Sequence, residues 1–187
     1  MASKSNRRKW KNFKSHQYKL EKNNCIKRIY KQLKKTTKTE LNCQQIISFL
    51  NCSANFLGCF AEDQVTLISI RSFPVFFIVN VDSSNLPGSH WIAIFLTKTT
   101  IEVFDPLGFQ FHLWSRVPCK LLSFINLYAT NRKLLISNQI QSSYSVLCGF
   151  YCLFFVLSRP FFSFDEVQSF FSTKLYKNDS RLIKVFT

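Results

Sequence analysis

The sequence predicts an α+β domain in which a mostly antiparallel sheet packs on one central, buried helix. Segments 73–81 and 90–97 are rich in β-branched and aromatic residues and are bounded by Pro, Gly and Asp, which is typical of strands. The longest apolar run, 146–157, suits a buried helix and is well short of the roughly 20 residues that span a bilayer. Only four Gly and five Pro in 187 residues argue against a loop-dominated protein.

The individual elements follow from periodicity and from turn and capping residues. Apolar residues recur at helical spacing in the first predicted helix of the domain. Pro160 ends the buried helix, and Ser163 with Glu166 three residues later is a capping-box signature. In chain order we predict helices over 25–35 and 40–51, a turn at Gly58, a strand over 73–81, a loop over 82–89, strands over 90–97 and 100–105, a helix over 117–130, a strand over 133–141, the buried helix over 146–158 and an amphipathic helix over 163–176.

Residues 1–38 form a basic arm, and the domain spans 39–187. Of the net charge of +15, residues 1–40 carry +12, from 14 Lys and Arg against two acidic side chains. Such a block binds polyanions by neutralising phosphates and releasing counterions, and interleaved aromatic rings can stack on bases. The arm therefore favours nucleic-acid contact over a solubilising or nuclear-import role. Its candidate residues are Arg7, Arg8, Lys9, Lys11, Lys14, Lys34 and Lys35, with Trp10, Phe13, Tyr18 and Tyr30 between them.

His90 places an ionisable ring where a turn-rich loop becomes an apolar strand. If the following hairpin turns between Thr97 and Lys98, antiparallel pairing sets His90 directly opposite Asp105, with Cβ atoms about 5 Å apart. A carboxylate there orients the imidazole and stabilises its protonated form. The alternative is a surface pair at two strand ends, which contributes little.

Cys148 falls in the first turn of the predicted buried helix. Ser143 and Ser145 precede it as candidate N-caps. A helix N-terminus and a neighbouring protonated His both favour a nucleophilic thiolate. Gly149 removes bulk beside the sulfur so that a carbonyl could approach, whereas Cys152 is expected to be a buried, small apolar residue. The seven cysteines contain no CxxC pair, so no metal site is predicted.

A glutamine precedes the cysteine in the loop that enters this helix. The amide of Gln141, seven residues before Cys148, can point at the space above the sulfur, where an oxyanion would form, with the Cys148 N–H as a second donor. Gln139 offers a rival register for the same role. Trp91 is expected to pack beside the site and shield the imidazole.

Together these segments resemble the adenovirus-type cysteine protease family (adenain-like), including the related maturation proteases of Polinton-like elements and adintoviruses. The similarity runs from about residue 43 to 157, and its strength lies in three motifs kept in order and spacing. The segments that carry it are Gly88-Ser89-His90-Trp91, Asp105-Pro106-Leu107-Gly108-Phe109 and Gln141 with Cys148-Gly149, supported by Phe56-Leu57-Gly58 and Ile78-Val79-Asn80.

The resemblance implies a papain-like, adenain-like fold and a thiol endopeptidase that works through an acyl-enzyme. His90 would be the general base and acid, Asp105 its orienting carboxylate, Cys148 the nucleophile and Gln141 the oxyanion donor. Members of the family mature viral structural precursors, often at sites with glycine near the scissile bond, and are helped by DNA. That last property agrees with the basic arm.

The resemblance also implies partners and a location. We expect precursor proteins as substrates, DNA as an activator bound by the arm, and no required cofactor. We also expect a monomer that is found in the host nucleus or cytoplasm and in the virion, and that is neither secreted nor attached to a membrane. The adenovirus enzyme uses a peptide cofactor joined through a cysteine that precedes its glutamine. Residues 128–139 contain no cysteine and Cys119 lies too early, so the use of such a peptide stays open.

Two alternatives remain on the sequence alone. One is a protease for ubiquitin-like modifiers, or an acetyltransferase, of the same fold; such deconjugating enzymes usually have an acidic residue where this chain has Leu147. The other is a non-catalytic, basic nucleic-acid-binding virion protein, which would leave the ordered motifs as coincidence. His112 and Trp114 are assigned no functional role.

Overall fold

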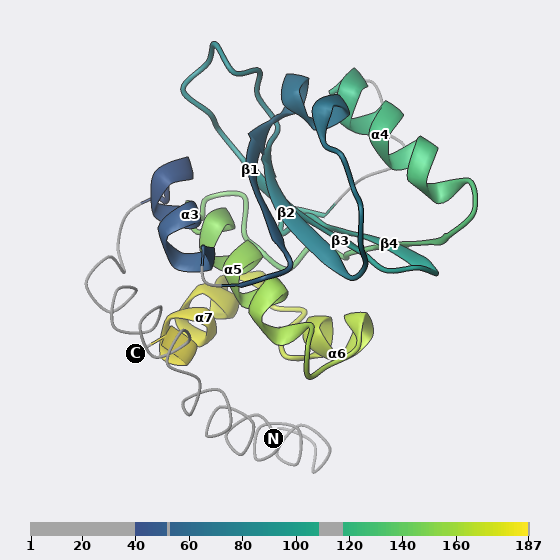
Figure 1. The fold of residues 1–187 in the computed structure, drawn as a ribbon. Coiled ribbons are helices and arrows are strands. Elements are labelled where there is room, and N and C mark those ends of the chain that lie inside the picture. The colour runs from purple at the N-terminus through teal and green to yellow at the C-terminus, as the bar shows by residue number, and fades with distance from the viewer. Residues whose placement is uncertain (1–39, 52, 109–117, 187) are drawn as a thin grey trace.

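The computed structural model describes residues 40–51, 53–108 and 118–186 (Figure 1). The predicted basic arm with its helix over 25–35, and His112 and Trp114, lie outside the described residues. The helices are α3 (Cys43–Leu50), α4 (Cys119–Ala129), α5 (Cys148–Ser158), α6 (Phe164–Ser169) and α7 (Asn178–Phe186), with 3-10 helices η1 (Glu62–Leu67) and η3 (Leu175–Lys177). The strands are β1 (Phe56–Ala61), β2 (Val75–Asn80), β3 (Trp91–Leu96), β4 (Thr100–Phe104) and β5 (Lys133–Ile136).

The five strands form one mixed sheet in the order β1-β2-β3-β4-β5. The central pairs, β2 with β3 and β3 with β4, are antiparallel as predicted. Both edge strands instead pair in parallel with their neighbours, which the sequence analysis did not anticipate. Parallel neighbours need a crossover connection, and the segments that contain η1 and α4 supply the two crossovers.

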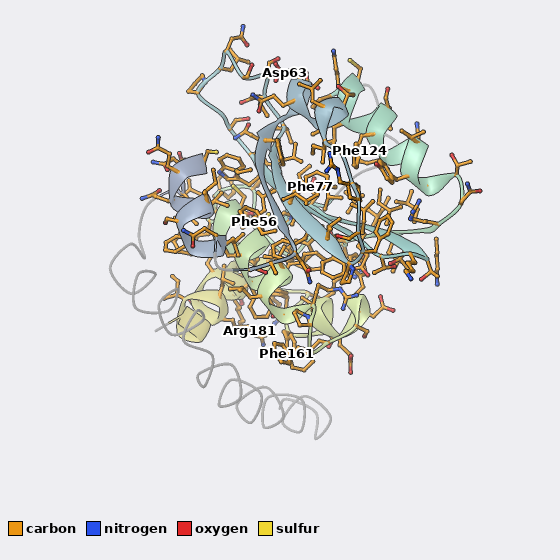
Figure 2. The ribbon with its side chains drawn as sticks, in the orientation of Figure 1. Phe56, Asp63, Phe77, Phe124, Phe161 and Arg181 are labelled. Carbon is orange, nitrogen blue, oxygen red and sulfur yellow. The ribbon has the colours of Figure 1, made fainter. Side chains whose placement is uncertain are left out.

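Helices cover both faces of the sheet, so the molecule has three layers (Figure 1). One apolar cluster joins the sheet to α3, α5, α6 and α7, and a second joins it to η1 and α4. Alternate residues of β2 enter the two clusters, Phe76 the first and Phe77 the second. The ring of Phe77 meets that of Phe124 in α4 edge to face at 5.4 Å, and Figure 2 shows both. Burial on both faces explains why β2 is apolar almost throughout rather than alternating.

The predicted central helix is confirmed as α5. Every residue of this helix except Leu157 is buried, so no polar face remains. Phe155 stacks on Phe104 of β4 with ring centroids 4.3 Å apart. Since burying one such side chain contributes roughly 1.5–3 kcal/mol, the sheet holds α5 firmly. The position of its first residue, Cys148, is therefore set by the core.

The hairpin between β3 and β4 turns one residue later than predicted. The hydroxyl of Thr97 accepts hydrogen bonds from the N–H groups of Thr99 and Thr100 at 3.1 and 2.8 Å, which closes a turn over Lys98 and Thr99. The observed pairs, such as Leu96 with Ile101, move each partner by two positions from the predicted register. A shift of two keeps every side chain on its predicted face.

Three other predictions need correction. Gly58 is not in a turn but inside β1, at a positive φ of 140°, where the pairing with β2 is irregular, as in a β-bulge. The strand predicted over 133–141 ends at Ile136, because the N–H groups of Ile140 and Gln141 both bind the carbonyl of Pro106 outside the ladder.

The amphipathic helix predicted over 163–176 is also shorter than expected. The Ser163–Glu166 capping box is present, but α6 ends at Ser169, and α7 begins only at Asn178. The side chain of Asn178 accepts from the Ser172 N–H at 2.7 Å and donates to the Ser172 carbonyl at 2.9 Å. These side-chain bonds replace helical ones and turn the chain between the two helices.

Candidate active site

Four of the predicted site residues line one cleft. This cleft has a volume of about 580 Å³. His90, Trp91, Gln141 and Cys148 all line it, together with residues of the loop over 82–89 and of the start of α3. Residues more than fifty positions apart thus share one surface.

His90 and Asp105 form the hydrogen bond that the sequence predicted, although not from directly opposed positions. His90 Nε2 lies 2.7 Å from Asp105 Oδ1, and the two side chains are only 14% and 12% exposed. In the observed register Asp105 is a diagonal neighbour of His90, which long side chains still reach. Since Nε2 is engaged, Nδ1 is the ring nitrogen left for Cys148.

Asp105 is itself held by groups that the sequence analysis missed. Its N–H donates to Ser137 Oγ at 2.8 Å, and the Ser137 hydroxyl donates back to the Asp105 carbonyl at 2.7 Å. Its Oδ1 also accepts from the Leu107 N–H at 2.9 Å. These bonds fix both the backbone and the carboxylate. A lone Ser at the end of a strand has no signal in the sequence that would identify this role.

His90 is protonated at neutral pH in this environment. Burial by itself lowers the pKa of His90, but hydrogen bonds and charges of Asp105 and Cys148 outweigh burial and raise the pKa to about 9. The usual value is 6.5. The cleft therefore holds an imidazolium beside Cys148.

Cys148 is the first residue of α5, as predicted, and is buried. The predicted caps are wrong: the N-cap position is Leu147, without a side-chain cap hydrogen bond. Ser145 instead accepts from the Leu147 N–H at 3.3 Å and donates to Asp179 in α7. Because no side chain caps α5, the N–H groups of its first turn remain open to a negative charge.

The structure separates the two glutamines that the sequence left as rivals. Gln141 lines the cleft and is 1% exposed, whereas Gln139 is exposed and does not line it. Gln141 Nε2 donates to the Ser145 carbonyl at 2.7 Å. An amide carries two N–H donors, so the second remains for a ligand. Gln141 Oε1 is buried and without a hydrogen-bond partner among the described groups.

Gly149 has a different neighbour from the one expected. A Cβ at this position would lie 3.0 Å from Leu41 Cβ and 3.4 Å from Trp91 Cδ1. The glycine therefore makes room for the segment that precedes α3 rather than for an incoming carbonyl. Trp91 Nε1 donates to the Leu41 carbonyl at 2.8 Å, which ties this segment to the residue after His90.

The neighbouring thiols differ from Cys148 in their surroundings. Cys152 is fully buried one turn along α5, and burial raises the pKa of its thiol. Burial, with the nearby Cys43, likewise raises the pKa of Cys59. Both thiols remain protonated at neutral pH. No group of three or more His, Cys, Asp or Glu side chains that could hold a metal occurs in the part of the chain that the structure describes.

Within the described ranges, no helix is both long and apolar enough to cross a membrane.

The fold and this cleft define the class of the protein: it is a cysteine peptidase of the adenain-like type, which acts on protein substrates. A sequence profile described as adenovirus endoprotease matches residues 56–177, more than half of the chain, and the chain belongs to that family.

Two further comparisons add little to this assignment. The crystal structure of the selenomethionine form of the ASFV pS273R protease is similar at 18% sequence identity, covering 96% of this chain and 89% of that one. Its TM-score of 0.42 is too low to support any argument about this chain. No match is found among curated proteins.

Proposed function

We propose that this chain is a thiol endopeptidase that matures structural precursor proteins of a virus or virus-like element. In this proposal Cys148 is the nucleophile, His90 the general acid and base, Asp105 the orienting carboxylate and Gln141 an oxyanion donor. The observation that supports it most is the 2.7 Å bond between His90 and Asp105 next to the thiol, which keeps the imidazole protonated.

The proposed reaction begins with attack of the Cys148 thiolate on the scissile carbonyl carbon. The carbonyl oxygen becomes an oxyanion, which accepts hydrogen bonds from the free N–H of Gln141 and from the Cys148 N–H. The imidazolium of His90 gives its proton to the leaving amine as the C–N bond breaks, leaving a thioester. Neutral His90 then takes a proton from water, the resulting hydroxide attacks the thioester, and the acid product departs with the thiolate restored.

Substrates and location extend this proposal. The family acts on proteins, and we infer structural precursors, cleaved where glycine lies near the scissile bond. The enzyme would act as a monomer in the host nucleus or cytoplasm and in the virion. A peptide cofactor is not part of the proposal, because residues 128–139 contain no cysteine to attach it.

DNA is the proposed activator, and the support is electrostatic. Residues 1–40 carry a net charge of +12, while the other 147 residues carry only +3. The arm would hold enzyme and DNA-bound substrate on one polyanion. Each phosphate contact makes the slope of log affinity against log salt more negative by about 0.9.

The test compares the wild type with Cys148→Ala on a glycine-containing precursor peptide, with and without duplex DNA. We expect cleavage by the wild type alone, and iodoacetamide labelling that blocks it. Equal cleavage by both forms would end the proposal. A modifier fusion and acetyl-CoA serve as parallel substrates, and preferred turnover of either would point to a deconjugating enzyme or an acetyltransferase.

The DNA part is tested separately. Replacing Arg7, Arg8, Lys9, Lys11, Lys14, Lys34 and Lys35 with Gln should abolish stimulation by DNA and flatten the salt dependence of binding, while the DNA-free rate stays the same. DNA binding with an unchanged salt slope would place the contact elsewhere.

A further inference from the structure

The loop that carries Gln141 packs on the apolar core only at its two ends, Ile140 and Leu147. Tyr144, near its middle, is 96% exposed, and Val146 is 46% exposed. Gln141 itself must be aimed accurately, because an oxyanion donor works only at hydrogen-bond distance. Between these buried ends, the position of residues 141–146 therefore depends on polar anchors.

Asn178, the first residue of α7, is one such anchor. Its side chain is fully buried, at 0% exposure. Its Nδ2 donates to the Ile140 carbonyl at 2.7 Å, directly before Gln141, while its other bonds go to the backbone of Ser172. Asn178 thus joins the start of the loop to α7.

Asp179, the next residue, anchors the other end of the loop. Its Oδ1 accepts from the Ser145 hydroxyl at 3.0 Å and from the Tyr151 hydroxyl at 2.8 Å. The Ser145 carbonyl in turn accepts from Gln141 Nε2 at 2.7 Å. A continuous series of hydrogen bonds therefore leads from Asp179 through Ser145 to the Gln141 amide.

Tyr151 fixes the carboxylate from inside the core. This residue of α5 is fully buried, and burial followed by the bond to Asp179 raises the pKa of its hydroxyl, so it stays a neutral donor. Tyr151 lies on the same helix as Cys148. Asp179 is consequently held in a fixed relation to the helix that carries the thiol.

We propose that Asn178 and Asp179 are positioning residues that aim the Gln141 amide at the oxyanion, so that α7 is part of the catalytic apparatus. This inference rests on the proposed function of Gln141. Both residues lie just beyond the stretch 56–177 that matches the family.

The experiment measures peptide cleavage and Cys148 alkylation in parallel. Alkylation by iodoacetamide needs the thiolate but forms no oxyanion, so it does not require Gln141. For Asp179→Ala we expect kcat to fall by about 10- to 100-fold, less than the roughly 10²- to 10³-fold cost of losing an oxyanion donor outright. KM and the alkylation rate should stay near the wild-type values.

A double-mutant cycle then tests whether Asp179 acts through Gln141. In a Gln141→Ala background, Asp179→Ala should cause no further loss of kcat. Asp179→Asn, which keeps an acceptor oxygen, should recover part of the activity. Tyr151→Phe removes only one hydroxyl and should lower kcat in the same direction, which keeps the proposal testable if Asp179→Ala does not fold.

Arg181→Gln is the matched control, because Arg181 lies on the same helix and donates to the Phe170 carbonyl at 3.3 Å, in the segment after α6. It should leave kcat unchanged. The inference is overturned if Asp179→Ala cleaves like the wild type, if alkylation falls together with kcat, or if the losses at Gln141 and Asp179 multiply. A wild type that cleaves no peptide would instead overturn the proposed function, and this inference with it.

Discussion

Asp105→Asn offers the sharpest test of the proposed chemistry. Moving the pKa of His90 from 6.5 to about 9 corresponds to about 3 kcal/mol in favour of the imidazolium, because one pKa unit is about 1.4 kcal/mol. Burial opposes this shift, and the hydrogen bond of Asp105 is the largest effect that favours it. The carboxylate of Asp105 is therefore the group that does most to raise the pKa of His90.

Replacing the carboxylate with an amide should lower the pKa of His90 by at least about one unit, to about 8 or below. The imidazolium is the proton donor to the leaving amine. Activity is therefore lost as pH rises through the pKa of His90. The alkaline limb of kcat/KM, which reports the free enzyme, should move from about pH 9 to about pH 8 or lower. At neutral pH, where a pKa of about 8 still leaves most of the imidazole protonated, kcat/KM should fall by less than the roughly 10²- to 10⁴-fold that general acid–base catalysis contributes as a whole.

The assay is peptide cleavage from pH 6 to 10, with iodoacetamide alkylation of Cys148 over the same range. Asp165→Asn is the control, since this exposed carboxylate in α6 carries the same charge and its loss changes the net charge equally. An alkaline limb that stays at pH 9 in Asp105→Asn, or that moves equally in the control, would refute the assignment of Asp105.

Two further substitutions test the packing that supports the site. Arg159 forms a two-point ion pair with Glu102, which is 1% exposed, at 2.6 and 2.7 Å. Arg159→Met leaves that carboxylate buried and unpaired, so urea unfolding should show a loss of about 3–5 kcal/mol. The kcat of the folded fraction should not change, and an undiminished stability would contradict the argument. Gly149→Ala gains up to about 1 kcal/mol of helix propensity but forces a Cβ to within 3.0 Å of Leu41, at a cost of about 1–3 kcal/mol. We expect lower thermal stability and lower kcat/KM. A stabilised, fully active variant would show that the segment before α3 can move away from the new Cβ at no cost.

The hairpin pattern predicted the pairing of His90 with Asp105, and the resemblance to the adenain-like family placed Cys148 in the same site. A hairpin brings its two ends together whatever its exact turn, and a register error of two positions keeps both side chains on one face. The predicted hydrogen bond between His90 and Asp105 was therefore correct although the turn after Thr97 was predicted one residue too early. The place of Cys148 in the fold was equally predictable, since an apolar run of this length is longer than most strands and favours a buried helix whose first turn holds the cysteine.

The seven-residue spacing to Cys148 favoured Gln141 but left Gln139 as a rival, because both are ordinary loop glutamines, and only the fold shows that Gln141 is the one that lines the cleft. The sequence likewise gave no signal for Ser137, which forms hydrogen bonds with the backbone of Asp105, or for the α7 residues Asn178 and Asp179.

By itself, then, the sequence determined the α+β class, the central strands and the buried helix, because periodicity encodes them, and its ordered motifs named the residues that we propose to carry the chemistry. The tertiary structure decided which groups hold those residues in place: the segment at Leu41, the serine behind Asp105 and the first turn of α7. These contacts join one side chain to the backbone or side chain of a distant segment. They have no period and no motif, and only the packing of the whole chain brings such partners within hydrogen-bond distance.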